Sequence, residues 1–111
     1  MAKSGKAPKN WRASKEFKSL RDELQRSMGG KDKLDAVTAA RIDEYMDFWV
    51  IRHQLQDDIT ARGLYVQDER GRTMENRSVS LSIQASRQMS AIAAALGLVI
   101  GAERKREYYE L

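Results

Sequence analysis

The stretch TAARIDEYMDFWVIRHQLQDDITARGLYVQDERGRTMENRSVSLSIQASRQMSAIAAALG, residues 38–97, decides the fold. The 24 residues from 39 to 62 repeat apolar side chains at helical spacing and would span about 36 Å at 1.5 Å per residue. A polar connection containing glycines follows over residues 63–76, and a second helical pattern returns over residues 79–96. The stretch therefore predicts a mainly helical protein built on an antiparallel pair of long helices.

The connection between these helices has the pattern of a small β-hairpin. Two short β-type runs, residues 64–66 and 72–74, flank a polar turn that ends in Gly71. Three residues per strand are too few for an independent hairpin, so we expect it to pack on the helices or on another subunit. Residues suited to begin or end the helices stand at the expected places: Thr38, Asn76–Ser78, Gly63 and Gly97.

The first long helix carries apolar side chains on two faces. One face holds Ile42, Tyr45, Met46, Trp49 and Val50, and the other holds Phe48, Ile51, Leu55 and Ile59. Its wet sector is predicted to hold Asp43, Asp47, Gln54 and Asp58. One return helix covers a single stripe somewhat over 100° wide, so neighbouring copies of the chain are the economical cover for the rest. We therefore predict a homo-oligomer with these interface residues: Ile42, Tyr45, Met46, Phe48, Trp49 and Leu55.

The N-terminal region is strongly basic. Residues 1–33 hold ten Lys and Arg against four Asp and Glu, whereas residues 34–111 hold ten against twelve. A short helix is expected over residues 14–28, begun by Ser14 and ended by Gly29-Gly30. A basic arm on a neutral body is a layout typical of polyanion binding, so nucleic acid is the leading partner. The predicted DNA contacts are Lys3, Lys6, Lys9, Arg12, Lys15, Lys18, Arg21, Arg26, Lys31 and Lys33.

Trp11 has two open interpretations within this region. It could stack on a base, or it could pack as a staple on the helix that follows it in the chain, residues 14–28. We favour packing, because single-strand binders use a series of aromatic residues and this arm has one.

No catalytic pattern stands out, and we predict no enzyme activity, metal or cofactor. His53 lies four residues before Asp57, but two such ligands do not make a site, and a structural or interfacial histidine is the favoured interpretation. The sequence has no cysteine, no phosphate loop of the GxxxxGK type and no apolar run of about 20 residues for a membrane span.

The order of several short motifs resembles the small subunit of tailed-bacteriophage terminases over roughly residues 17–104. The motifs are Gly63-Leu64-Tyr65-Val66, Arg70-Gly71-Arg72, Glu75-Asn76, Ala85–Met89, Ala95-Leu96-Gly97-Leu98 and Arg104. The resemblance implies a non-catalytic factor for DNA packaging that forms a homo-oligomeric ring, such as a nonamer. It would bind double-stranded viral DNA and recruit the large subunit, an ATPase and nuclease, in the cytoplasm of the infected bacterium.

The same resemblance implies three functional parts. Residues 1–33 would contact DNA, residues 34–98 would build the ring, and residues 99–111 would form a tail that docks on the large subunit. The docking residues would be Leu98, Val99, Ile100, Arg104, Tyr108 and Tyr109. Two alternatives remain open: a dimeric transcription regulator with helix 14–28 in the major groove, and a structural adaptor or virion protein whose lysines serve solubility.

Overall fold

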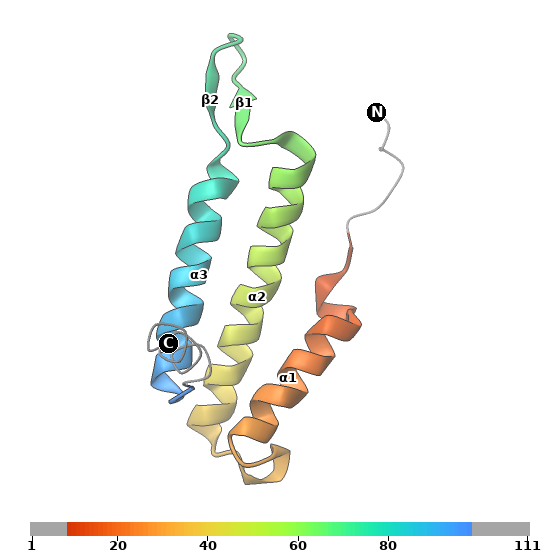
Figure 1. Ribbon diagram of the computed structural model, residues 1–111, viewed down its shortest axis with the longest axis vertical. Coiled ribbons are helices and arrows are strands. Elements are labelled where there is room, and N and C mark those ends of the chain that lie inside the picture. The colour runs from red at the N-terminus through yellow and green to blue at the C-terminus, as the bar shows by residue number, and fades with distance from the viewer. Residues whose placement is uncertain (1–8, 99–111) are drawn as a thin grey trace, which may run out of the picture.

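Three helices and a two-stranded hairpin make up the described part of the chain. The computed structural model describes residues 9–98 (Figure 1). In chain order the elements are η2 (Trp11–Ala13), α1 (Lys15–Ser27), η3 (Lys31–Lys33), α2 (Ala36–Arg62), β1 (Tyr65–Gln67), β2 (Thr73–Glu75) and α3 (Arg77–Ala95). Helices α1 and α3 lie on either side of α2, and the hairpin projects beyond the end of the α2–α3 pair (Figure 1). The mainly helical prediction is confirmed.

Each helix begins at a side chain that accepts a backbone N–H. The Ser14 hydroxyl accepts from Phe17 N at 3.1 Å, as the sequence predicted for α1. For α2 the predicted cap, Thr38, is wrong: Asp35 is the cap, and its carboxylate accepts from Thr38 N at 2.7 Å. Helix α2 therefore starts three residues earlier than expected, because Asp35 satisfies an N–H group that would otherwise lack a partner.

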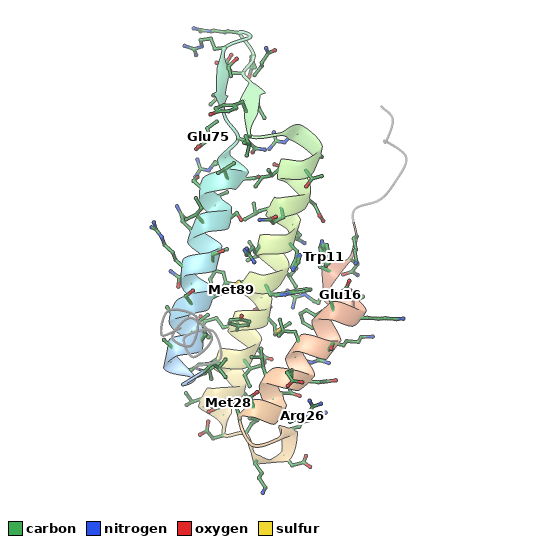
Figure 2. The ribbon with its side chains drawn as sticks, in the orientation of Figure 1. Trp11, Glu16, Arg26, Met28, Glu75 and Met89 are labelled. Atoms are coloured by element: carbon green, nitrogen blue, oxygen red, sulfur yellow. The ribbon has the colours of Figure 1, made fainter. Side chains whose placement is uncertain are left out.

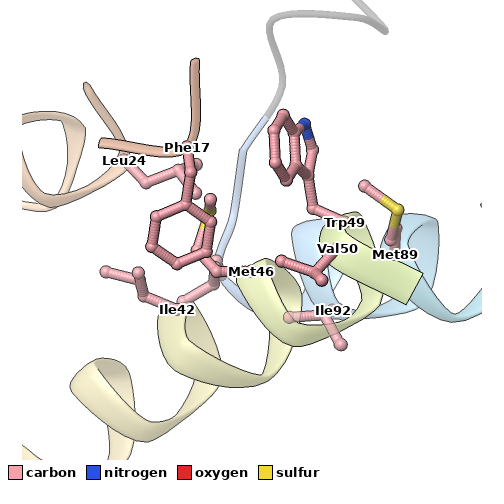
Figure 3. Close-up of a cluster of buried hydrophobic side chains, with 9 residues drawn as sticks. Phe17, Leu24, Ile42, Met46, Trp49, Val50, Met89 and Ile92 are labelled. Carbon is pink, nitrogen blue, oxygen red and sulfur yellow. The ribbon is translucent and has the colours of Figure 1, made fainter. Parts of the chain in front are cut away.

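The core forms where the three helices meet (Figure 3). Aliphatic side chains of α3 pack against one side of α2, and Phe17 and Leu24 of α1 pack against another. This burial supplies most of the stabilisation, because helices of this length are marginal in water without tertiary packing. The buried core residues are Phe17, Leu24, Ile42, Met46, Trp49, Val50, Met89, Ile92 and Leu96.

This core corrects part of the predicted oligomer interface. Ile42 and Met46 are 1% exposed and Trp49 is 9% exposed within a single chain, so these three side chains are already covered. Side chains of both α1 and α3, among them Phe17, Leu24 and Ile92, pack with these three residues in one core cluster. Tyr45, Phe48 and Leu55 remain half-buried and are the part of the predicted set that a neighbour can still contact.

The β-hairpin is confirmed one residue further along than predicted. Its strands pair antiparallel, with Val66 opposite Met74 at the centre of the register. The turn closes at Gly71, where φ of +79° favours glycine. The hairpin stands clear of the described helices in Figure 1, so the predicted packing on them is not found, and Tyr65 and Met74 remain exposed.

A buried polar cluster ties the hairpin to the helices. Asn76 is fully buried, and its side chain accepts from Ser78 N at 2.9 Å and donates to Gly63 O at 2.9 Å. Asp58 accepts from Ser78 Oγ at 2.6 Å and from Nε and Nη2 of Arg62 at 2.7 and 2.8 Å. The prediction that Asp58 lies in a purely wet sector is therefore wrong, because the start of α3 returns to that sector.

Candidate nucleic-acid interface

The predicted DNA-contacting side chains that the structure describes follow α1 and its two ends. The apolar face of α1, with Phe17 and Leu24, is turned toward α2. Lys15 and Lys18 come from other sectors of the helix and are exposed. Lys3 and Lys6 lie outside the described residues.

Four of the basic side chains have partners within the chain. Lys9 pairs with Glu16 at 3.4 Å, Arg12 with Asp47 at 2.9 Å, and Arg26 with Glu23 at 2.6 Å. The Arg21 guanidinium lies 5.5 Å from the centre of the Phe17 ring. These ion pairs are solvent-exposed, and exposed pairs contribute little to stability, so exchanging a carboxylate for a phosphate would cost little.

The other four basic side chains are exposed and form no ion pair with another described residue: Lys15, Lys18, Lys31 and Lys33. The first two lie on α1, and the other two lie on η3, which joins α1 to α2. The 13 residues of α1 span about 20 Å, the length of roughly six base pairs at 3.4 Å each. The lysines therefore lie on α1 and on the connection that follows it, and α1 itself matches a short stretch of duplex backbone in length.

The N-terminal strap, residues 9–14, packs beside α2 through Trp11, whereas the sequence predicted that Trp11 would pack on the helix that follows it. Trp11 stacks on His53 with ring centres 4.2 Å apart and meets Trp49 edge-on at 5.7 Å. Trp11 Nε1 also donates to Asp57 Oδ2 at 2.7 Å. Figure 2 shows Trp11 between α1 and α2. Packing, rather than base stacking, is thus the role that the structure gives to Trp11.

His53 and Asp57 both contact Trp11 of this strap. Burial, aided by the nearby positive charge of Arg52, lowers the pKa of His53 and favours the neutral ring against the indoles. Sequence reasoning placed both residues on one helix side but missed Trp11 as their partner. The spacing Trp49, His53, Asp57 was the available signal, since side chains four apart share a helix face.

We expect Trp11→Ala to lower the free energy of unfolding by about 2 kcal/mol, because it removes a half-buried indole and its hydrogen bond to Asp57. Trp11→Phe keeps a ring on His53 and should cost roughly half as much. Urea denaturation followed by circular dichroism measures both. Equal stability of Trp11→Ala and the parent chain would show that the strap does not hold the arm in solution.

Other potential sites are limited within residues 9–98. No cluster of three or more His, Cys, Asp or Glu side chains is placed to hold a metal ion there, and no helix in that range is long and apolar enough to cross a membrane. Leu98 packs against the core and its N–H donates to Ala93 O at 3.0 Å, so it closes α3. The other predicted docking residues, Val99, Ile100, Arg104, Tyr108 and Tyr109, lie outside the described residues.

Comparison with known proteins identifies the family of this chain. A model of the phage terminase small-subunit family matches residues 13–108, which is most of the chain. The chain belongs to the phage terminase small-subunit family. This confirms the resemblance seen in the sequence, and small subunits of this family are generally the non-catalytic ones. No curated protein and no solved structure shows significant similarity.

Proposed function

We propose that this chain is a non-catalytic terminase small subunit that binds double-stranded viral DNA and presents it to the large subunit during genome packaging in the infected bacterial cell. Family membership supports the role in packaging. The observation that carries the DNA-binding part is the set of four exposed lysines on α1 and η3 that have no carboxylate partner among the described residues.

In this proposal the lysines bind DNA phosphates, and the strap determines where residues 1–8 join the rest of the protein. A lysine ammonium is a compact point charge that binds phosphate without reading the base sequence. The strap holds residue 9 beside the start of α1, through the Lys9–Glu16 ion pair, so residues 1–8 join the body at the basic helix. Lys3 and Lys6 would then add to the same positive surface.

Each copy needs to bind only weakly if several copies act together. Joined in a homo-oligomeric ring, the copies bring many basic surfaces to one duplex at high effective concentration. Affinity then comes from the number of engaged copies, and any sequence preference comes from DNA shape or from a few base contacts. The C-terminal tail, residues 99–111, is the proposed docking segment for the large subunit.

The salt dependence of DNA binding tests this function. If one copy neutralises about four phosphates, the log–log slope of affinity against salt is about −3.6, and affinity falls roughly a hundredfold between 50 and 200 mM salt. Assembled copies that bind the same duplex would steepen that slope. Fluorescence anisotropy with a labelled duplex measures it, and a flat plot would rule out the proposed phosphate contacts.

A further inference from the structure

Helix α2 carries a line of exposed and half-buried side chains that neither α1 nor α3 covers. The α2 stripe consists of Val37, Ala40, Glu44, Phe48, Ile51 and Leu55, which repeat at intervals of three and four. Val37 is 64% exposed and Ile51 is 43% exposed. Such spacing places all six on one side of the helix, about 27 Å long, as in helices that pack against a partner helix.

The α2 stripe borders one of two grooves between α2 and α3. The apolar groove is lined by Phe48, Ile51 and Leu55 of α2 with Leu81 and Ala85 of α3, and also by the polar side chains Gln84, Arg87 and Gln88. Helical geometry places the second groove on the other side of the α2–α3 seam, where Ser82, Ser86 and Ser90 lie along α3. The first groove is thus apolar along α2, the second is lined mainly by polar side chains, and Arg87 lines both.

The serine-lined groove is positively charged and has no carboxylate in its lining. Its lining includes Arg52 and Arg87. Arg52 Nε is buried without a hydrogen-bond partner among the described residues, and neither arginine forms an ion pair with another of them. A buried unpaired donor is costly, so an acceptor from outside the described fold would stabilise it.

The α2 stripe offers the matching acceptor. Glu44 is the one carboxylate in the stripe, is exposed, and forms no ion pair with a described residue. Ile83, at the rim of the serine-lined groove, is 51% exposed and matches the apolar groove in chemistry. Each side therefore carries what the other lacks: a carboxylate for the arginines, and an apolar side chain for the apolar groove.

We propose that the α2 stripe of one copy packs on the serine-lined groove of the next, with Glu44 between Arg52 and Arg87 and with Ile83 against Phe48, Ile51 and Leu55. This interface specifies how copies join in the ring of the proposed function and rests on that function. Because it joins two different surfaces, the contact is head-to-tail and repeats from copy to copy until it closes. Arg87 lines the edge of both grooves, so the test of this interface rests on the pairing of Glu44 with the arginines of the serine-lined groove.

Charge reversal tests the interface directly. Glu44→Arg and Arg87→Glu should each raise the midpoint concentration of assembly roughly tenfold or more, because each places like charges together. The double variant Glu44→Arg/Arg87→Glu restores one opposite pair, although the introduced arginine still faces Arg52, so it should assemble more readily than either single variant and less readily than the parent chain. Light scattering and analytical ultracentrifugation over a concentration series measure the mass, and circular dichroism confirms that each variant keeps its helices.

Two reversals on the β-hairpin turn, Glu69→Arg and Arg70→Glu, are matched controls and should leave the mass unchanged. If both single variants, at Glu44 and at Arg87, assemble at the same concentration as the parent chain, this interface is wrong. The proposal of a ring would not be affected by that result. No recovery in the double variant would overturn the Glu44–Arg87 pairing. A parent chain that stays monomeric would overturn both the interface and the ring, whereas phosphate binding is judged separately by its salt dependence.

Discussion

Replacing Lys15, Lys18, Lys31 and Lys33 together by glutamine is expected to weaken duplex DNA binding roughly a hundredfold or more at 50 mM salt, because each lysine neutralises one phosphate. The log–log salt slope should become shallower by about 0.9 for each phosphate that is no longer neutralised. All four side chains are exposed, so the fold should be unaffected. Fluorescence anisotropy across a salt series gives both the affinity and the slope.

Two double variants test whether DNA binding depends on where the positive charges lie or only on the net charge of the protein. Lys15→Gln/Lys18→Gln and Arg70→Gln/Arg77→Gln each remove two exposed positive charges, the first pair on α1 and the second at the hairpin end. Only the α1 variant should lose a substantial part of the salt slope. Equal losses in both variants would mean that overall charge, rather than the α1 surface, attracts DNA.

The largest effect on stability is expected from Asn76→Ala, at about 3 kcal/mol of unfolding free energy. The change removes the cap of α3 and leaves Gly63 O without its donor in a fully buried position. Asn10→Ala is the matched control, since Asn10 precedes η2 and makes no side-chain cap bond. It should change stability by less than about 0.5 kcal/mol in urea denaturation. Similar values for the two variants would show that the polar cluster does not hold the hairpin end.

The same cluster gives the protein a sensitivity to acid. Hydrogen bonds from Arg62 first, and then from Ser78, hold the pKa of Asp58 well below its usual value of 3.8. A lowered pKa in the folded state adds stability above pH 3.8 that is lost as the pH falls toward the folded pKa. Asn76→Ala also removes the Asn76 Nδ2 donor to Asp58, so this acid-linked loss should be smaller in that variant.

Local patterns in the sequence predicted the elements well, because they depend on neighbours in the chain. Helical spacing and the cap Ser14 placed α1, and the turn at Gly71 placed the hairpin to within one residue. The start of α2 was missed because Asp35 and Thr38 are both residues that begin helices, and apolar spacing does not choose between them. The helix begins at Asp35 because its side chain is the one that accepts a free N–H group of the first turn.

Contacts between distant segments were harder to predict. Asp58 looked wet on a helical projection of α2, and its partners Asn76 and Ser78 lie about 20 residues away at the start of α3. Trp11 is 46 residues from Asp57. Likewise, the burial of Ile42, Met46 and Trp49 depends on where α1 docks. Periodicity identifies an apolar side of a helix, but it does not identify the segment that covers it.

Helix α2 runs for 27 residues, about 40 Å, from the connection that carries Lys31 and Lys33 to the β-hairpin. Because this helix is uninterrupted, it holds the exposed β-hairpin and the connection with Lys31 and Lys33 about 40 Å apart. A protein that binds the hairpin would therefore contact the chain at the opposite end of α2 from these two lysines.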